Sequence, residues 1–145
     1  MRKSVVLLWA LTLLWAGLIV SFSRDCWSAL RTGELLGGFG ISAPWIQATN
    51  TVVRKTVHLS EYAVFGASLS LAVLTHFPRF YGRGGARVLA AVCALYALAD
   101  EAHQVFQPHR TAAARDVVID TVGAALAIYV LYRLRRFRKL IPTIN

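Results

Sequence analysis

The sequence has little acid, little cysteine and little charge of any kind. Of its 145 residues, seven are Asp or Glu, two are Cys, and 16% are charged, whereas 57% are hydrophobic. A soluble domain has about 25% charged residues and about 45–50% apolar residues. These proportions argue against an ordinary soluble domain and predict a surface that faces lipid.

Familiar functional motifs are missing as well. The sequence contains no nucleophile elbow, phosphate-binding loop or metalloprotease motif. Its two cysteines, Cys26 and Cys93, fall in a predicted loop and midway along an apolar segment. We therefore expect no disulfide, no metal–thiolate site and no cofactor.

The positive charge is the main excess in the composition, with a net charge of +9. A basic chain can bind nucleic acid, but here Lys and Arg stand at the ends of apolar runs. That distribution is typical of membrane orientation and of contact with anionic headgroups. We expect membrane lipids as partners, and no nucleic acid.

Four apolar segments are long enough to cross a bilayer, which takes about 20 residues. The sequence thus predicts an all-α, polytopic membrane protein with a single membrane domain over 1–145, a multi-pass protein of the cell membrane. The stretch 21–24 has no small-x-small cleavage site, so we interpret the first segment as an uncleaved helix. The predicted helices span about residues 4–23, 55–77, 86–106 and 116–134.

The first link, 24–54, is the long one. It contains Trp27 and Trp45, and its glycines together with Pro44 argue against another spanning helix. Because Trp favours the headgroup level, we expect this link to be interfacial or partly re-entrant.

Orientation follows from the basic residues that flank the four segments. Ten lie on the side of the termini and six on the other side. The positive-inside rule then places both termini in the cytoplasm. The ten are Arg2, Lys3, Arg79, Arg83, Arg87, Arg133, Arg135, Arg136, Arg138 and Lys139; the six are Arg24, Arg31, Arg54, Lys55, Arg110 and Arg115.

Five of the seven acids fall near the outer ends of the last three helices. Each ionisable group at such depth costs roughly 2.5–3.5 kcal/mol to insert, so their shared level indicates a common role. Residues three and four apart share a helix face, and the polar residues form three such stripes. The stripes are His58, Glu61, Tyr62 and Phe65; Asp100, His103 and Gln104; and Asp116, Asp120, Gly123 and Ala127. We predict one outward-opening polar pocket, with candidate site residues His58, Glu61, Tyr62, Asp100, Gln104, Arg110, Asp116 and Asp120.

Structural interpretations compete with a ligand role. His58 and Glu61 could form a hydrogen bond within their helix, and Asp116 could be a first-turn acid that favours the helix dipole. Arg110 could form an ion pair with Asp116 or Asp100. Glu101 must point about 100° away from Asp100, so we expect it to be exposed.

A metal site is the remaining interpretation of the histidines and acids. Asp100-x-x-His103 and His58-x-x-Glu61 have the spacing of carboxylate–histidine pairs in metal-binding bundles. Arg54, Lys55 and Arg110 would oppose a cation there, so we expect ion pairing and no metal.

The polar segments resemble the motifs of the VanZ-like family, over about residues 1–135 and in the same order. The matching stretches are 54–62 (RKTVHLSEY) followed by Gly66, 100–110 (DEAHQVFQPHR) and 116–124 (DVVIDTVGA). The resemblance implies a four-helix membrane protein of the cell envelope associated with low-level resistance to teicoplanin. It does not imply a particular molecular activity.

Three functions remain open on the sequence. The favoured one is a non-enzymatic envelope protein whose pocket binds a lipid headgroup, a lipid-linked wall precursor or a lipoglycopeptide. The second is a membrane-embedded enzyme, with Asp100 or Glu61 as general base, His58 as acid and Arg110 as phosphate clamp. The third is a transporter that uses the acids as proton carriers, although four helices are few for alternating access.

The orientation can be tested with thiol labelling. We predict that a membrane-impermeant reagent labels Cys26 in intact cells, because Cys26 lies in the loop on the side with fewer basic residues. A cysteine introduced between Arg79 and Arg83 should be labelled only after the membrane is opened. Labelling of the introduced cysteine instead of Cys26 would show the opposite orientation.

Overall fold

The described part of the chain is helical. The computed structural model describes residues 3–24, 37–40, 42–80, 82–106 and 113–136, and no strand occurs among them. Its long helices are α1 (Lys3–Arg24), α3 (Ala43–His76), α4 (Arg83–Gln104) and α5 (Ala114–Arg136). A short 3-10 helix, η1 (Pro78–Phe80), follows α3.

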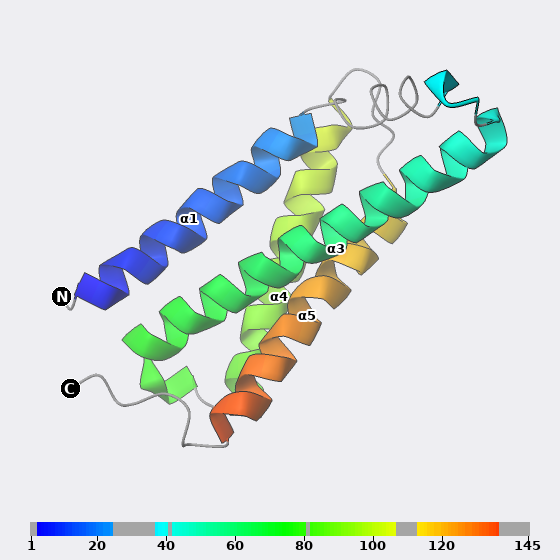
Figure 1. The fold of residues 1–145 in the computed structure, drawn as a ribbon. Coiled ribbons are helices and arrows are strands. Elements are labelled where there is room, and N and C mark those ends of the chain that lie inside the picture. Colours follow the sequence, from blue (N-terminus) through cyan, green and yellow to red (C-terminus); the bar gives the residue numbers. More distant parts are fainter. Residues whose placement is uncertain (1–2, 25–36, 41, 81, 107–112, 137–145) are drawn as a thin grey trace.

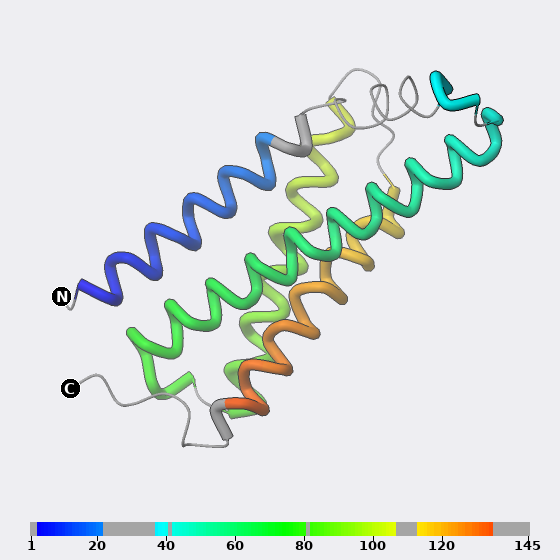
Figure 2. Tube along the Cα trace, viewed as in Figure 1, coloured from blue at the N-terminus to red at the C-terminus, as the bar shows by residue number. Residues whose placement is uncertain are grey.

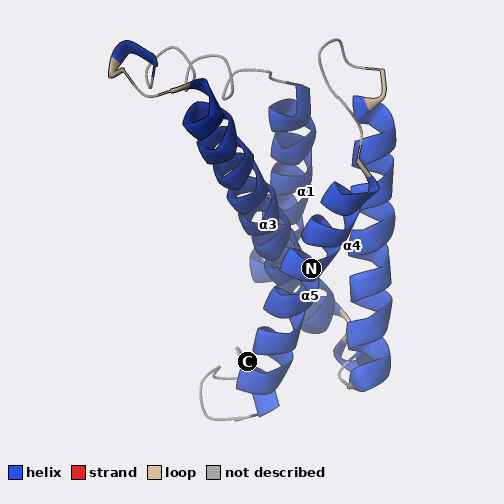
Figure 3. Ribbon diagram, turned by 90° about the vertical axis from the view of Figure 1, so that its right-hand side faces the viewer, coloured by secondary structure: helices blue, strands red, loops and turns tan. Residues whose placement is uncertain are grey.

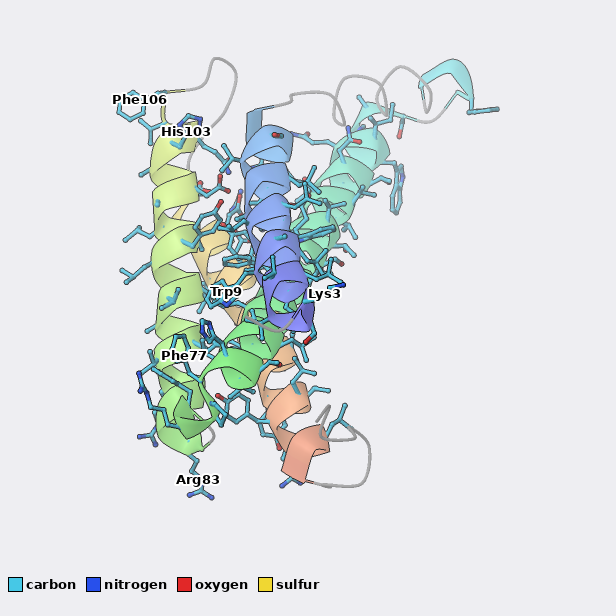
Figure 4. All side chains as sticks on the ribbon, turned by 90° about the vertical axis from the view of Figure 1, so that its left-hand side faces the viewer. Lys3, Trp9, Phe77, Arg83, His103 and Phe106 are labelled. Atoms are coloured by element: carbon cyan, nitrogen blue, oxygen red, sulfur yellow. The ribbon has the colours of Figure 1, made fainter. Side chains whose placement is uncertain are left out.

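Successive long helices run in opposite directions, as the trace in Figure 2 shows. The start of α1, the end of α3 and the end of α5 therefore lie at one end of the bundle (Figure 1). Figure 4 shows Arg83 at this same end of α4, and His103 and Phe106 at the opposite end. We name the first the terminal end and the second the loop end.

Three of the helices are long and apolar enough to cross a membrane, namely α1, α3 and α5. Many of their outward side chains are large and apolar; Leu7, Leu13 and Val118, for example, are exposed. A hydrophobic core that includes Ile19, Phe65 and Leu69 lies between the helices, and Cys93 is fully buried in it. This arrangement is that of a membrane-type helical protein, because exposed apolar surface of this extent suits lipid better than water.

Helix α3 is much longer than the predicted segment 55–77. It begins at Ala43 and contains 34 residues, about 51 Å at 1.5 Å per residue. The helix predicted to start at about residue 55 therefore starts twelve residues earlier, at Ala43. The reason is that Pro44 stands in the first turn, where proline has no hydrogen bond to lose. The extra turns carry α3 past the start of α5 (Figure 1), and this part of α3 leans away from α1 and α4 (Figure 3).

Helices α3 and α5 come into backbone contact at two glycines. A Cβ on Gly123 would lie 2.3 Å from the backbone oxygen of Leu59, and one on Gly66 would lie 2.8 Å from that of Ala124. Small residues at facing positions let two helices approach to backbone contact. This contact, which we name the glycine seam, fixes how the polar residues of α3 and α5 face each other.

The glycine seam predicts a large cost for adding one methyl group. Gly123→Ala should destabilise the protein by about 1–3 kcal/mol, because the added Cβ meets backbone that cannot rotate away. Thermal unfolding in detergent measures the loss. Gly17→Ala is the matched control, since nothing lies within 4 Å of a Cβ there. Equal melting temperatures for the two variants would show that the seam is not a tight contact.

Candidate functional site

The polar residues of α3, α4 and α5 meet inside the loop end of the bundle. Seven of the eight predicted site residues are buried, and Arg110 lies outside the described residues. Burial of Glu61, Asp100 and Asp120 means that these three acids do not face lipid. The seven buried residues are His58, Glu61, Tyr62, Asp100, Gln104, Asp116 and Asp120. Together with Glu101, they form what we name the polar cluster.

Asp116 holds the upper layer of the polar cluster, nearest the loop end. It stands in the first turn of α5 and accepts a 3.0 Å hydrogen bond from Arg54 Nη2 and a 3.5 Å bond from Lys55 Nζ. Arg115 Nε lies 3.9 Å away and is mostly exposed. Asp116 lies in the first turn of α5, as the sequence indicated. Its ion pairs with Arg54 and Lys55 also connect α5 to α3.

One turn deeper, His58 of α3 faces Asp120 of α5. The His58 Nδ1 and Asp120 Oδ1 atoms are 3.5 Å apart, and both side chains are at most 9% exposed. This pair lies just beyond Gly123 and Leu59, whose contact brings the two helices close enough for it. His58 therefore faces a different helix, and the interpretation that it interacts only within its own helix is wrong.

Tyr62 and two aromatic neighbours form the floor of the polar cluster. The Tyr62 ring centroid lies 6.3 Å from those of Phe65 and Tyr96, and the latter two are 4.9 Å apart. Tyr62 is fully buried. The aromatic rings separate the polar cluster from the apolar interior toward the terminal end.

Helix α1 attaches to this floor through hydrogen bonds to backbone carbonyls. Trp15 Nε1 donates to the Glu61 carbonyl over 2.8 Å, and Tyr96 Oη donates to the Ala16 carbonyl over 2.8 Å. Ile19 fills the adjacent core at 1% exposure. No periodic pattern in the sequence singles out Trp15 or Tyr96, because each is an aromatic residue in an apolar run.

On α4, Asp100 and Gln104 are joined by a 3.2 Å hydrogen bond from Gln104 Nε2. Both are buried, as their helical spacing predicted, and His103 of the same stripe is half-buried. The spacing alone predicted this shared face correctly.

Glu101 corrects the sequence interpretation. It was expected to be an exposed charge, but it is 5% exposed. Its Oε1 accepts a hydrogen bond from the backbone N–H of Ala113, just before α5. The residue just before α5 lies close enough to α4 to bond this carboxylate. A helical wheel of α4 alone cannot show a contact with another segment. Glu101 therefore belongs to the polar cluster.

Several polar atoms of the cluster are enclosed without a direct hydrogen bond. Within the described residues, Tyr62 Oη, Asp120 Oδ1 and Glu101 Oε2 have no hydrogen-bond partner. Among the same residues, no three His, Cys, Asp or Glu side chains are grouped as a metal site would require. Oxygen atoms dominate these open positions, so the cluster offers acceptors to a group that carries donors.

The Asp116 ion pairs predict a measurable loss of stability. Asp116→Ala should lower the free energy of unfolding by about 1–2 kcal/mol, because it leaves the half-buried Arg54 without its charged acceptor. Denaturation in detergent measures this loss. Arg115→Ala is the control and should change little, since Arg115 is exposed and 3.9 Å from Asp116. An Asp116→Ala protein as stable as the control would show that the pairs contribute nothing.

Comparison with known proteins finds one family model that covers most of the helical bundle. The family model described as VanZ/LLP1 matches residues 8–136, which include every residue of the polar cluster. No curated protein and no solved structure matches the chain. The resemblance seen in the polar motifs is thereby confirmed: the chain belongs to the VanZ/LLP1 family.

Proposed function

We propose that the chain crosses the cell membrane four times, with α4 as the fourth span and both termini in the cytoplasm. The 22 residues of α4 extend about 33 Å, enough for the hydrocarbon core. Its Asp100 and Glu101 are buried, so their charges do not face lipid. Under this orientation the polar cluster opens toward the outside of the cell.

We propose further that the polar cluster binds the headgroup of a lipid, a lipid-linked wall precursor or a lipoglycopeptide, without chemical turnover. The observation that supports this is the open hydrogen-bonding capacity of Tyr62, Asp120 and Glu101 inside a cluster built by three helices. Buried polar atoms without partners cost free energy. A bound headgroup with hydroxyl or ammonium donors removes that cost.

The family gives the proposal its physiological setting. VanZ-like proteins are associated with low-level teicoplanin resistance, and a site on the outer side of the membrane meets both wall precursors and lipoglycopeptides. We propose that binding at the polar cluster modulates susceptibility to such antibiotics.

A catalytic alternative has one specific observation in its favour. His58 Nδ1 lies 3.5 Å from Asp120 Oδ1, and a carboxylate beside an imidazole is a common arrangement in general acid–base catalysis. Turnover of a lipid-linked substrate by the purified protein, abolished by Asp100→Asn, would establish this alternative. Binding of the headgroup without turnover would exclude it for that substrate.

The binding proposal predicts a selective loss of function. Expression of the protein in a susceptible cell should raise the inhibitory concentration of a lipoglycopeptide, and Asp120→Asn should remove the increase while the protein remains folded in the membrane. Thr121→Ala is the control, because the neighbouring Thr121 hydroxyl bonds only to the Val117 carbonyl of its own helix. Full protection by folded Asp120→Asn would contradict a role for the cluster in susceptibility.

A further inference from the structure

An apolar groove runs along the flank of the bundle between α1 and α3. It is lined by Trp15, Thr56, Val57, Ser60, Glu61 and Val64. The hydroxyls of Thr56 and Ser60 bond to carbonyls of their own helix, so the groove presents mainly apolar surface. Both helices that form the groove, α1 and α3, are long and apolar enough to span a membrane. Hydrocarbon chains are therefore its natural surroundings.

The groove and the polar cluster share one residue, Glu61. Glu61 is one of the residues that line the groove, its side chain is buried, and its backbone carbonyl accepts the Trp15 hydrogen bond. The apolar groove and the polar cluster beside it match the apolar and polar parts of an amphiphilic molecule. A soluble polar ligand would use only the cluster, whereas a lipid would use both parts.

The charges of the cluster select among lipid headgroups. Of the described cations, Arg54, Lys55 and Arg115 all lie within 4.0 Å of Asp116. None of the Lys or Arg side chains that the structure describes lies within that distance of Asp120 or Glu101, and the basic group beside Asp120 is His58, whose Nδ1 lies 3.5 Å from Asp120 Oδ1. An anionic headgroup would meet like charges there. A primary ammonium would supply both the opposite charge and three donors, whereas a quaternary ammonium supplies no donor.

We propose that the groove between α1 and α3 seats an acyl chain of a phospholipid whose primary-ammonium headgroup lies at the polar cluster. The lipid enters sideways from the leaflet at the loop end, with its chain against Trp15, Val57 and Val64. This inference rests on the proposed headgroup-binding function and names its ligand class.

Trp15 provides the probe, because it forms one wall of the groove. A variant with Trp9, Trp27 and Trp45 replaced by Phe keeps Trp15 as the sole tryptophan. It is reconstituted, as the full chain, in phosphatidylcholine vesicles with equal fractions of dibrominated phosphatidylethanolamine, phosphatidylcholine or phosphatidylglycerol. Bromine quenches tryptophan on contact. We expect the ethanolamine lipid to quench Trp15 with an apparent affinity about tenfold above that of the choline lipid, the advantage of a charge-assisted hydrogen bond.

Two groove variants and one matched control test the seat of the chain. Val57→Phe and Val64→Phe, made separately, should each abolish the preference by filling the groove. Val118→Phe should retain it, because Val118 is exposed on α5 and does not line the groove. Asp120→Asn should weaken the preference through the headgroup.

The outcomes separate the groove from the headgroup site. Loss of the preference in Asp120→Asn but in neither groove variant would overturn the groove and leave the proposed function standing. Equal quenching by all three lipids, or strongest quenching by phosphatidylglycerol, would overturn the ligand class, while the susceptibility test of Asp120→Asn still decides the function. A change of oligomeric state in the groove variants, measured by sedimentation, would make the groove a protein interface and overturn the proposal.

Discussion

Gly123 lies against the backbone of Leu59 so closely that a Cβ would approach the carbonyl oxygen to 2.3 Å. Everything polar at the loop end depends on this distance. With larger residues at the seam, α5 would stand further from α3, and neither Arg54–Asp116 at 3.0 Å nor His58–Asp120 at 3.5 Å could form. The polar cluster is thus a consequence of close helix packing, because short side chains at the seam let long polar ones meet above it.

Within the polar cluster, the number of basic side chains around each acid falls from Asp116 at the loop end to Asp120 one turn deeper. Asp116, nearest the loop end, is surrounded by three basic side chains. Asp120, one turn deeper, faces a histidine, and below it the rings of Tyr62, Phe65 and Tyr96 close the cluster. Long basic side chains can reach the membrane boundary but are expensive at depth, which explains why the deeper acid has the smaller partner.

The attachment of α1 differs from that of the other helices. Two of its hydrogen bonds run between aromatic side chains and backbone carbonyls, Trp15–Glu61 and Tyr96–Ala16, and a third runs from Trp9 Nε1 to His76 Nδ1. Most of the apolar surface of α1 faces outward. The contact between α3 and α5 is a backbone contact at two glycines. A groove between α1 and α3 is compatible with this difference, because α1 meets α3 through large side chains that hold the two helix axes apart.

The helical class, the apolar segments and the three polar stripes could be predicted from the sequence, because they follow from composition and from the periodicity of single helices. The sequence also carried the VanZ/LLP1 motifs, which the family match confirms. The contacts between helices could not be predicted in this way, because they depend on tertiary packing. The start of α3 at Ala43, the burial of Glu101 against Ala113 and the pairing of His58 with Asp120 each depend on how one segment lies against another. Helical periodicity gives the face of a residue, but the partner on that face belongs to a different helix, and only packing selects it.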